Sequence, residues 1–280
     1  MRLFYFMSLV LLSYVECRVG VFIVSYKEDA MLYNLIQSIR ESDVWADESR
    51  RPYIRVINTN KTPLRERLVQ QLPEDILVTD ILQSSKARGH TSKYYNEAIV
   101  SGFDSLKKPQ LEWLVTIQAD TVLCKDWYAS VEAAMQTCDF FQHGAGDQFV
   151  AYKPTAISEV GLWDELYFGI AGHEGDYFLR AAMILGARAC INDHHHGRVN
   201  SPSPSSISDH ITCNSPDTGF HRNDNPSRAK SQEYYDIFAK PYFLRKWSAC
   251  GYSDTAWPVS PPPMCQPNIE EINFYPHFME

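Results

Sequence analysis

An apolar run that ends abruptly at an acidic residue constrains the fold of this chain more than any other feature. Within residues 111–127, the run at 114–117 suits a buried strand, Asp120 follows it closely, and helical spacing covers 126–135. A buried strand that leads into a helix is the unit of a parallel α/β sheet, which binds ligands at the carboxyl ends of its strands. Asp120 is therefore a candidate for holding Mg²⁺ or Mn²⁺ on a diphosphate, and a capping aspartate is the alternative.

The same alternation of strand and helix precedes this segment. Apolar runs predict strands at 18–25, 53–57 and 76–82. Helical spacing follows the first strand, with Asp29 as its N-cap, and returns in the later part of 85–106. Strands that alternate with helices predict an α/β fold with a Rossmann-type, mostly parallel sheet flanked by helices.

The pattern is less regular in the second half of the chain. We predict short apolar strands at 140–141 and 149–152, helices at 155–160 and 176–185, and a strand at 187–191. A Ser/Pro-rich, mobile loop at 201–208 and a helix over 227–247, broken at Pro241, follow. No second βαβ unit is recognisable. We therefore expect one domain over 18–200 and a C-terminal extension over 201–280 with a mobile loop, a helix and a Pro-rich tail.

Composition and charge narrow the class of protein. The chain has 280 residues, of which 45% are hydrophobic, so it can bury a large core. Its net charge of −8 argues against broad electrostatic binding to nucleic acid, which favours a basic face. We therefore expect a globular protein with no nucleic-acid partner.

The N-terminus and the cysteines point to an oxidising compartment. Residues 1–17 have the layout of a signal peptide or a short signal-anchor, because Arg2 is followed by a short apolar run that ends near Cys17. We expect entry into the secretory pathway, to the ER or Golgi lumen or as a secreted protein. The seven cysteines lack the CxxC spacing of a zinc site, and the six after Cys17 can pair there in a connectivity that the sequence leaves open.

Polar residues near strand ends are the candidate ligand contacts. Asn58 follows the second strand, where its amide can read the edge of a base, and a turn residue is the alternative. Gly89 and Asn96 lie in a basic segment at a helix start, which suits a phosphate or a ribose. A solvated basic helix end is the alternative for that segment.

Two carboxylates and a histidine triplet are the candidate catalytic and metal residues. Glu174 and Asp176 lie on a glycine-flanked segment that opens a helix. Either can act as a general base toward an acceptor hydroxyl, and helix capping is the alternative. The triplet at 194–196 follows a predicted strand, and an imidazole can complete the coordination of a transition metal. For each of the three histidines, a plain loop residue is the alternative.

In this order, the segments resemble those of nucleotide-sugar glycosyltransferases of the GT-A fold, with glycosyltransferase family 2 the most similar in pattern. The resemblance covers 19–201 and extends weakly to 247. It rests on 21–27 (VFIVSYK), 57–60 (INTN), 89–99 (GHTSKYYNEAI), 118–120 (QAD, in the place of the DxD motif), 159–165 (EVGLWDE), 173–180 (HEGDYFLR), 194–197 (HHHG) and 246–247 (KW).

The resemblance implies a GT-A-like catalytic domain and a role for each site residue on the donor side. Contacts to the nucleotide sugar are expected from Ser25, Tyr26, Asn58, Gly89, Asn96, Gln118 and Asp120. The implied cofactor is a divalent metal, Mn²⁺ or Mg²⁺, held by Asp120 and His194. The implied partner is a nucleoside-diphosphate sugar donor.

On the acceptor side, the resemblance implies contacts from Trp163 and Asp164 to a carbohydrate, glycan or glycoprotein. Glu174 is the expected base, with Asp176 as the other candidate. Deprotonation of the acceptor in a single displacement would invert the anomeric carbon.

Two departures from the family pattern leave alternatives open. Gln118 replaces the first acid of DxD, and Asn58 replaces an acid that reads uracil. The rival hypothesis is a non-catalytic carbohydrate- or nucleotide-sugar-binding protein on a degenerate GT-A fold. A nucleotidyltransferase is disfavoured because residues 25–29 lack a Gly-rich basic loop.

Overall fold

The computed structural model describes residues 19–26, 29–68, 72–81, 90–144, 146–167, 172–193, 197–199, 211–213, 233–250 and 275–279. None of the helices in these ranges has the length and apolar content that a membrane crossing requires. The predictions for the leader at 1–17, Gly89, the histidines at 194–196 and the loop at 201–208 lie outside the described residues.

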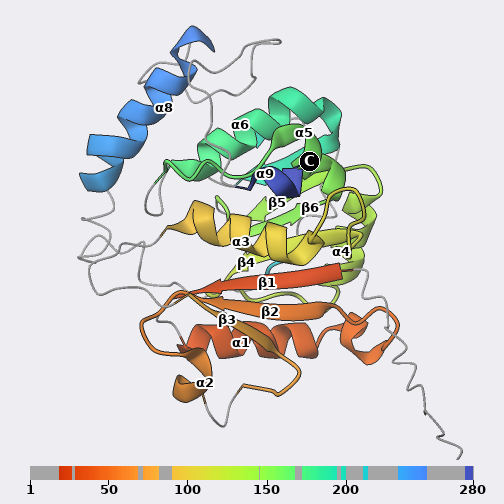
Figure 1. The fold of residues 1–280 in the computed structure, drawn as a ribbon. Coiled ribbons are helices and arrows are strands. Elements are labelled where there is room, and N and C mark those ends of the chain that lie inside the picture. Colours follow the sequence, from red (N-terminus) through yellow and green to blue (C-terminus); the bar gives the residue numbers. More distant parts are fainter. Residues whose placement is uncertain are drawn as a thin grey trace, which may run out of the picture.

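One mixed sheet forms the centre of the molecule (Figure 1). In the described residues its eight strands follow the order β3 (Leu77–Asp80), β2 (Tyr53–Asn58), β1 (Val19–Ser25), β4 (Trp113–Gln118), β6 (Phe149–Tyr152), β5 (Phe140–Gly144), β7 (Ala189–Asp193) and β8 (Gly197–Val199). β1 to β4 are parallel, β6 is antiparallel to β4 and β5, β5 and β7 are parallel, and β8 is antiparallel to β7. The carboxyl ends of β1–β5 and β7, and the start of β6, therefore meet at one edge, the carboxyl edge.

Helices cover both faces of this sheet. One face carries α1 (Asp29–Arg40), the 3-10 turn η1 (Asp43–Ala46), α2 (Leu64–Arg67) and α4 (Trp127–Met135). The other face carries α3 (Thr91–Phe103), α5 (Pro154–Val160), α6 (His173–Leu185) and α9 (Pro276–Met279). A 3-10 turn, η2 (Gly186–Arg188), follows α6. A third cluster packs on α6 and contains the π-helical turn η4 (Tyr235–Ala239), α8 (Lys240–Trp247) and the 3-10 turn η5 (Ser248–Cys250).

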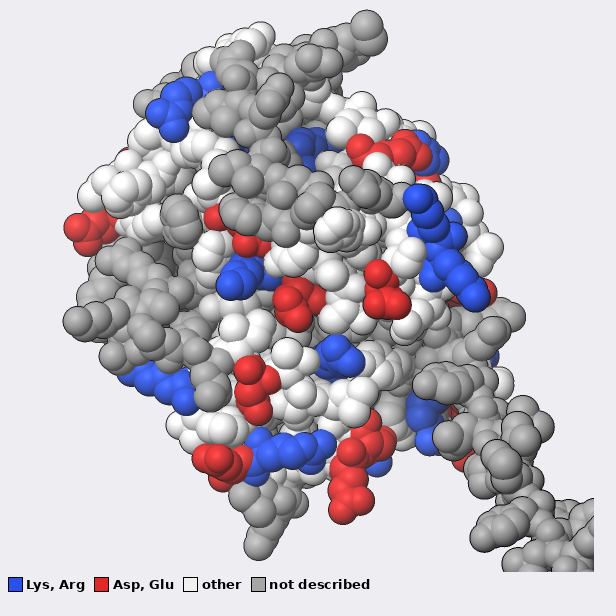
Figure 2. Space-filling view, in the orientation of Figure 1, with Lys and Arg blue, Asp and Glu red and all other residues white. Residues whose placement is uncertain are grey.

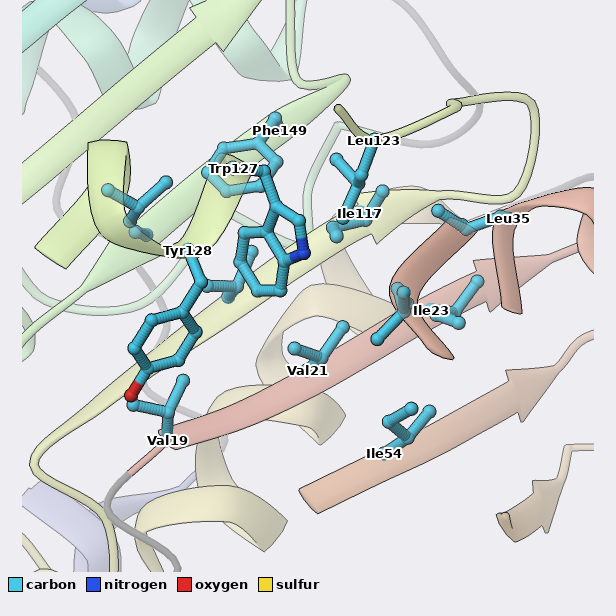
Figure 3. Packing of buried hydrophobic residues seen from close by; sticks show 14 of the residues in the cluster. Val19, Val21, Ile23, Leu35, Ile54, Ile117, Leu123, Trp127, Tyr128 and Phe149 are labelled. Atoms are coloured by element: carbon cyan, nitrogen blue, oxygen red, sulfur yellow. The ribbon is translucent and has the colours of Figure 1, made fainter. Parts of the chain in front are cut away.

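The central strands are buried on both faces because their apolar residues alternate between two cores. On β1, Val21 and Ile23 belong to the core under α1 and α4, and Phe22 belongs to the core under α3. Figure 3 shows the first of these cores, where Trp127 of α4 and Leu35 of α1 lie over the sheet. Removal of this apolar surface from water is the main favourable term in forming the layers.

The predicted α/β class and the order of strands and helices are confirmed. The largest difference near the site is the start of α6, which begins at His173 rather than at residue 176. Gly172 has a φ of 85°, a left-handed conformation that glycine adopts at no steric cost, and it ends the preceding loop. Glu174 and Asp176 consequently lie in the first turn, where the helix dipole favours carboxylates.

The C-terminal segments pack onto the main body. Phe278 of α9, the dark blue helix in Figure 1, is buried in the core formed with α3, α5 and α6. The predicted break at Pro241 corresponds to a change of helix type, since η4 is π-helical and α8 begins at Lys240. Proline lacks the N–H that would continue the earlier hydrogen-bond pattern.

Disulfides join segments that are far apart in the sequence. Cys124 pairs with Cys213, and Cys138 pairs with Cys190. Cys250 is also disulfide-bonded. The first of these bridges ties the loop after β4 to residues 211–213, and the second ties the segment before β5 to β7.

Candidate active site

The strand ends place three predicted donor contacts at the carboxyl edge. Ser25, Asn58 and Gln118 are the last residues of β1, β2 and β4, and strand pairing sets Ser25 beside Asn58 and Val24 beside Gln118. β7 ends at the same edge, at Asp193. The histidine triplet follows Asp193 in the sequence and lies outside the described residues. The topology therefore brings Ser25, Asn58 and Gln118 to one edge, as ligand binding in open α/β sheets requires.

The amide of Asn58 makes contacts within the protein. Its Nδ2 donates to Oδ1 of Asp80 at 2.6 Å and to the carbonyl oxygen of Thr62 at 3.0 Å, and its Oδ1 accepts from Nη2 of Arg67 at 2.8 Å. Arg67 also forms an ion pair with Asp29. Asn58 is buried, whereas Asp80, the last residue of β3, is exposed. The exposed polar group beside Asn58 is therefore a carboxylate that the sequence pattern did not single out.

The last residue of β1 is buried, and the residue that follows it is exposed. Ser25 is buried, and its carbonyl oxygen accepts from N and Oγ1 of Thr59 at 2.9 and 3.0 Å. Tyr26 is 48% exposed. Tyr26 thus presents an aromatic ring at the carboxyl edge, and nucleobases stack on such rings.

Asn96 binds the backbone of the loop that follows α5. Its Oδ1 accepts from the backbone N of Trp163 at 2.8 Å, and its Nδ2 donates to the carbonyl oxygen of Trp163 at 2.8 Å and to Oε1 of Glu165 at 2.9 Å. Trp163 is buried and stacks on Tyr177, with ring centroids 4.3 Å apart. Asn96 and Trp163 therefore fix the shape of this loop from inside the core.

A line of polar contacts crosses from the end of β4 to the first turn of α6. Nε2 of Gln118 donates to Oδ1 of Asp147, in the turn between β5 and β6. Oδ2 of Asp147 lies 2.7 Å from Nε2 of His173, and Nδ1 of His173 lies 3.2 Å from Oε2 of Glu174. We refer to Gln118, Asp147, His173 and Glu174 as the acid–imidazole array. The array connects two predicted site residues, Gln118 and Glu174, through two others.

The two carboxylates of this array favour protonation of His173. Burial of the ring opposes protonation, but the carboxylates of Glu174 and Asp147 outweigh burial and raise the pKa of His173 above its usual value. Nε2 of His173 is hydrogen-bonded to Asp147, whereas Nδ1 lies at ion-pair distance from Glu174. Tyr95 donates its hydroxyl to the carbonyl oxygen of Asp147 at 3.3 Å, and burial raises the pKa of that hydroxyl well above its usual value.

A second charged cluster holds α8 against the start of α6. Nζ of Lys246 lies 2.8 Å from Oδ2 of Asp164 and 2.9 Å from Oδ1 of Asp176. Nε of Arg180 donates to Asp176 at 3.1 Å, and Nε1 of Trp247 donates to it at 2.8 Å. Burial opposes ionisation of Asp176, but Lys246 and Arg180 outweigh it and lower the pKa of Asp176 below its usual value. Asp176 is therefore held as an ion by three donors.

Asp120 lies just beyond β4 in a loop tied to residues 211–213. The Cys124–Cys213 disulfide joins the two segments, and the backbone N of Cys213 donates to the carbonyl oxygen of Val122 at 2.8 Å. Asp120 is partly exposed. Among the described residues, no group of three or more His, Cys, Asp and Glu side chains has the arrangement of a metal site. Asp120 fits a metal whose remaining ligands come from substrate phosphates and water, which is the usual arrangement for Mg²⁺.

Asp147 is a site residue that the sequence pattern did not reveal. It follows Gly146 directly, and Gly144 and Gly146 have φ values of 92° and 56° between β5 and β6. Neighbouring glycines had also marked the segment of Glu174, so a comparable signal was present. Asp147 follows β5, which is parallel to β7, but the turn leads into the antiparallel strand β6 and not into a helix, so a search for strand-to-helix units does not find it.

Comparisons with known proteins find similarity in structure but not in sequence. Neither a family model nor a curated protein sequence matches the chain. Solved structures that match include S. aureus TarS 1-349, the mannosyltransferase PcManGT from Pyrobaculum calidifontis in complex with GDP-Man and Mn²⁺, and the catalytic domain of Drosophila β1,4-galactosyltransferase 7 in complex with xylobiose.

The matches are partial and distant. TarS is 12% identical over 63% of this chain and 58% of its own, with a TM-score of 0.44, and PcManGT is 17% identical over 63% and 55%, with a TM-score of 0.43. The Drosophila enzyme is 9% identical over 75% of each chain, with a TM-score of 0.45. The chain thus spans little more than half the length of the first two proteins. It is similar to these structures in the course of its backbone, and at these TM-scores the similarity assigns it neither a substrate nor a mechanism.

Proposed function

We propose that this protein is a glycosyltransferase that moves a sugar from a nucleoside-diphosphate sugar to an acceptor hydroxyl. The observation that carries the proposal is the acid–imidazole array, which links Gln118 at the end of β4 to Glu174 in the first turn of α6. Asp120 follows Gln118 closely in the sequence. The array therefore joins the segment suited to a diphosphate with a carboxylate suited to proton abstraction. The resemblance of the sequence to GT-A glycosyltransferases supports the same function.

Donor binding belongs to the carboxyl edge in this proposal. Tyr26 stacks on the base, and the exposed carboxylate of Asp80, oriented by Asn58, accepts from an N–H of that base. Asp120 would hold a divalent ion, Mn²⁺ or Mg²⁺, which would supply positive charge to a bound diphosphate. As the resemblance implies, we propose that Gly89 contacts the donor and that His194 is a ligand of the metal.

Glu174 is the proposed general base. Its side chain is 20% exposed, so it reaches the surface where an acceptor can bind. In the transfer step the acceptor oxygen bonds to the anomeric carbon, the bond from that carbon to the diphosphate oxygen breaks, and the hydroxyl proton passes to Glu174. Attack opposite the leaving group in one displacement inverts the anomeric carbon.

Asp176 has a different role in this proposal. It is wholly buried and accepts from Lys246, Arg180 and Trp247, whereas a base needs an oxygen that the acceptor can reach. Together with Asp164, it anchors α8 beside the first turn of α6. The acceptor is a carbohydrate, glycan or glycoprotein, bound on the side of the site that this cluster and the loop around Trp163 support.

Charge and disulfides support the expected partners and compartment. On the face shown in Figure 2, Lys and Arg are interspersed with Asp and Glu, and the net charge of the chain is −8. Such a surface suits a small donor at a local site better than nucleic acid. The Cys124–Cys213 and Cys138–Cys190 disulfides and the disulfide-bonded Cys250 suit an oxidising compartment, which supports the proposed entry into the secretory pathway.

A donor screen tests the proposed function. The full chain is incubated with UDP-, GDP- and dTDP-sugars, with and without Mn²⁺, and the released nucleoside diphosphate is measured. We expect one donor to release its diphosphate faster with Mn²⁺, and faster again with a carbohydrate acceptor. Binding of a donor without release of any nucleoside diphosphate would instead identify the non-catalytic binding protein that the loss of the first DxD acid also allows.

A further inference from the structure

We infer that His173 and Asp147 are positioning residues that hold the carboxylate of Glu174 in place and balance its charge. The inference rests on the proposed function, in which Glu174 is the base. It assigns a role to two residues that neither the strand-end pattern nor the proposed chemistry otherwise uses.

The geometry fixes the ring of His173 from several sides. The side chain is 1% exposed, and its ring centroid lies 5.5 Å from that of Trp163 and 6.3 Å from that of Tyr95. Each ring nitrogen faces a different carboxylate, Nε2 toward Asp147 at 2.7 Å and Nδ1 toward Glu174 at 3.2 Å. Rotation of the ring would break both contacts at once.

A fixed partner matters for a glutamate base. The glutamate side chain has several rotatable bonds, so an unrestrained carboxylate spends much of its time away from the reactive geometry. The contact with His173 restrains Oε2 of Glu174, and Asp147 restrains His173 in turn. Gln118 completes the support, because its amide donates to the second oxygen of Asp147.

The charges around His173 favour its protonated form. The groups that face it are Glu174 and Asp176 on α6, Asp147 on the β5–β6 turn, and His90 and Tyr95 at the start and in the first half of α3. Acidic groups dominate this set and raise the pKa of His173. A neighbouring imidazolium keeps a carboxylate ionised, and a general base must be ionised before it accepts a proton.

The test compares pH profiles of transfer for the wild type, His173→Gln and Asp147→Asn. Glutamine keeps a donor but removes the positive charge, so we expect kcat to fall at least about tenfold while the donor KM stays within about twofold. The acid limb of the profile should move to higher pH in His173→Gln, because Glu174 loses the cation that favours its ionised form. Asp147→Asn should move the limb in the same direction by less.

A matched control and a second measurement separate positioning from general damage to the fold. His143 is also buried, and its ring nitrogens lie 3.2 Å from Oγ1 of Thr212 and 3.4 Å from Nδ2 of Asn192. His143→Gln should keep the wild-type pH profile. Nuclear magnetic resonance of the imidazole nitrogens gives a readout that needs no activity: in Asp147→Asn, His173 should lose its proton at a lower pH than in the wild type.

The outcomes are distinct. If His173→Gln transfers sugar with the pH profile of the wild type, the inference is overturned. It is also overturned if His173 titrates in Asp147→Asn as it does in the wild type. In both cases the proposed function still holds. Failure of the wild type to release a nucleoside diphosphate from any donor overturns the proposed function, and the inference falls with it.

Discussion

Nζ of Lys246 lies 2.9 Å from Oδ1 of Asp176, and both side chains are wholly buried. The same nitrogen lies 2.8 Å from Asp164, in the loop between α5 and α6. One lysine from α8 therefore joins this loop to the first turn of α6, the turn that also carries Glu174. Helix α8 is thereby part of the support of the candidate site.

Replacement of Lys246 by methionine should strongly destabilise the protein. Methionine preserves much of the apolar stem, but among the described residues it leaves the buried Asp164 and Asp176 with Arg180 as their counter-charge. Removal of one partner from a buried ion pair typically costs about 3–5 kcal/mol. We expect a decrease of that size in the free energy of unfolding at neutral pH, measured by denaturant titration.

Lys125→Met is the matched control for that measurement. Lys125 pairs with Asp43 at 3.2 Å, but the two side chains are 76% and 65% exposed. Exposed ion pairs contribute at most about 1 kcal/mol. Equal decreases in the free energy of unfolding of the two variants would show that the buried ion pairs of Lys246 stabilise the protein no more than an exposed ion pair does.

The stabilising effect of Asp176 should depend on pH with a definite sign. Its folded pKa is lowered by Lys246 and Arg180, so its contribution is present above the unfolded value of about 3.9 and is lost as pH falls through the lower folded value. We expect the stability difference between the wild type and Asp176→Asn to be constant near neutral pH and to shrink below about pH 4. Unfolding curves at a series of pH values measure it, and a difference that grows in acid would contradict the ion pair.

Asn96→Leu should destabilise the loop that contains Trp163. The substitution removes the Oδ1 that accepts from the backbone N of Trp163 and the Nδ2 that donates to its carbonyl oxygen, each at 2.8 Å. An unsatisfied buried polar group costs about 1–3 kcal/mol, so we expect a loss of about 2–5 kcal/mol. Gln110→Leu, at an exposed amide that donates to Asp104 at 3.2 Å, is the control and should change stability by about 0.5 kcal/mol or less. A stable Asn96→Leu protein would mean that the loop does not need this clamp.

Gln118→Glu should impair the protein, although it restores the first acid of the DxD motif. The new carboxylate would face Asp147, which now accepts from the amide of Gln118. Two like charges in hydrogen-bonding contact oppose each other's ionisation, and we expect a loss of about 1–3 kcal/mol at neutral pH and a lower kcat/KM. The measurements are the free energy of unfolding and Mn²⁺-dependent transfer. Higher activity with tighter Mn²⁺ dependence would show that position 118 is simply a degraded metal ligand.

The fold class and the positions of the strand ends followed from the sequence because both depend on short-range patterns. Val21, Phe22 and Ile23 alternate between two cores, and Ser25 and Asn58 end parallel strands, so periodicity and strand direction sufficed to place them. The same reasoning gave the α/β order and placed Gln118 near the edge.

Long-range partners could not be predicted in the same way. Asn96 and Trp163 are 67 residues apart, and Lys246 lies 82 residues from Asp164. No local pattern reports which backbone group an amide will bind or which acid a buried lysine will neutralise. The roles foreseen for Asn96, Trp163 and Asp164 were direct contacts with ligands, and the structure shows each of them in contact with the protein itself; their roles toward donor and acceptor stay predictions.

The most direct measurement compares sugar transfer by the wild type, Asp120→Asn and Glu174→Gln with the donor found in the screen and saturating acceptor. We predict metal-stimulated transfer by the wild type, loss of that stimulation in Asp120→Asn, and a drop of about a hundredfold or more in kcat for Glu174→Gln with donor binding retained. Transfer at the wild-type rate by both variants would contradict the claim that these two carboxylates serve one reaction at the carboxyl edge of the sheet.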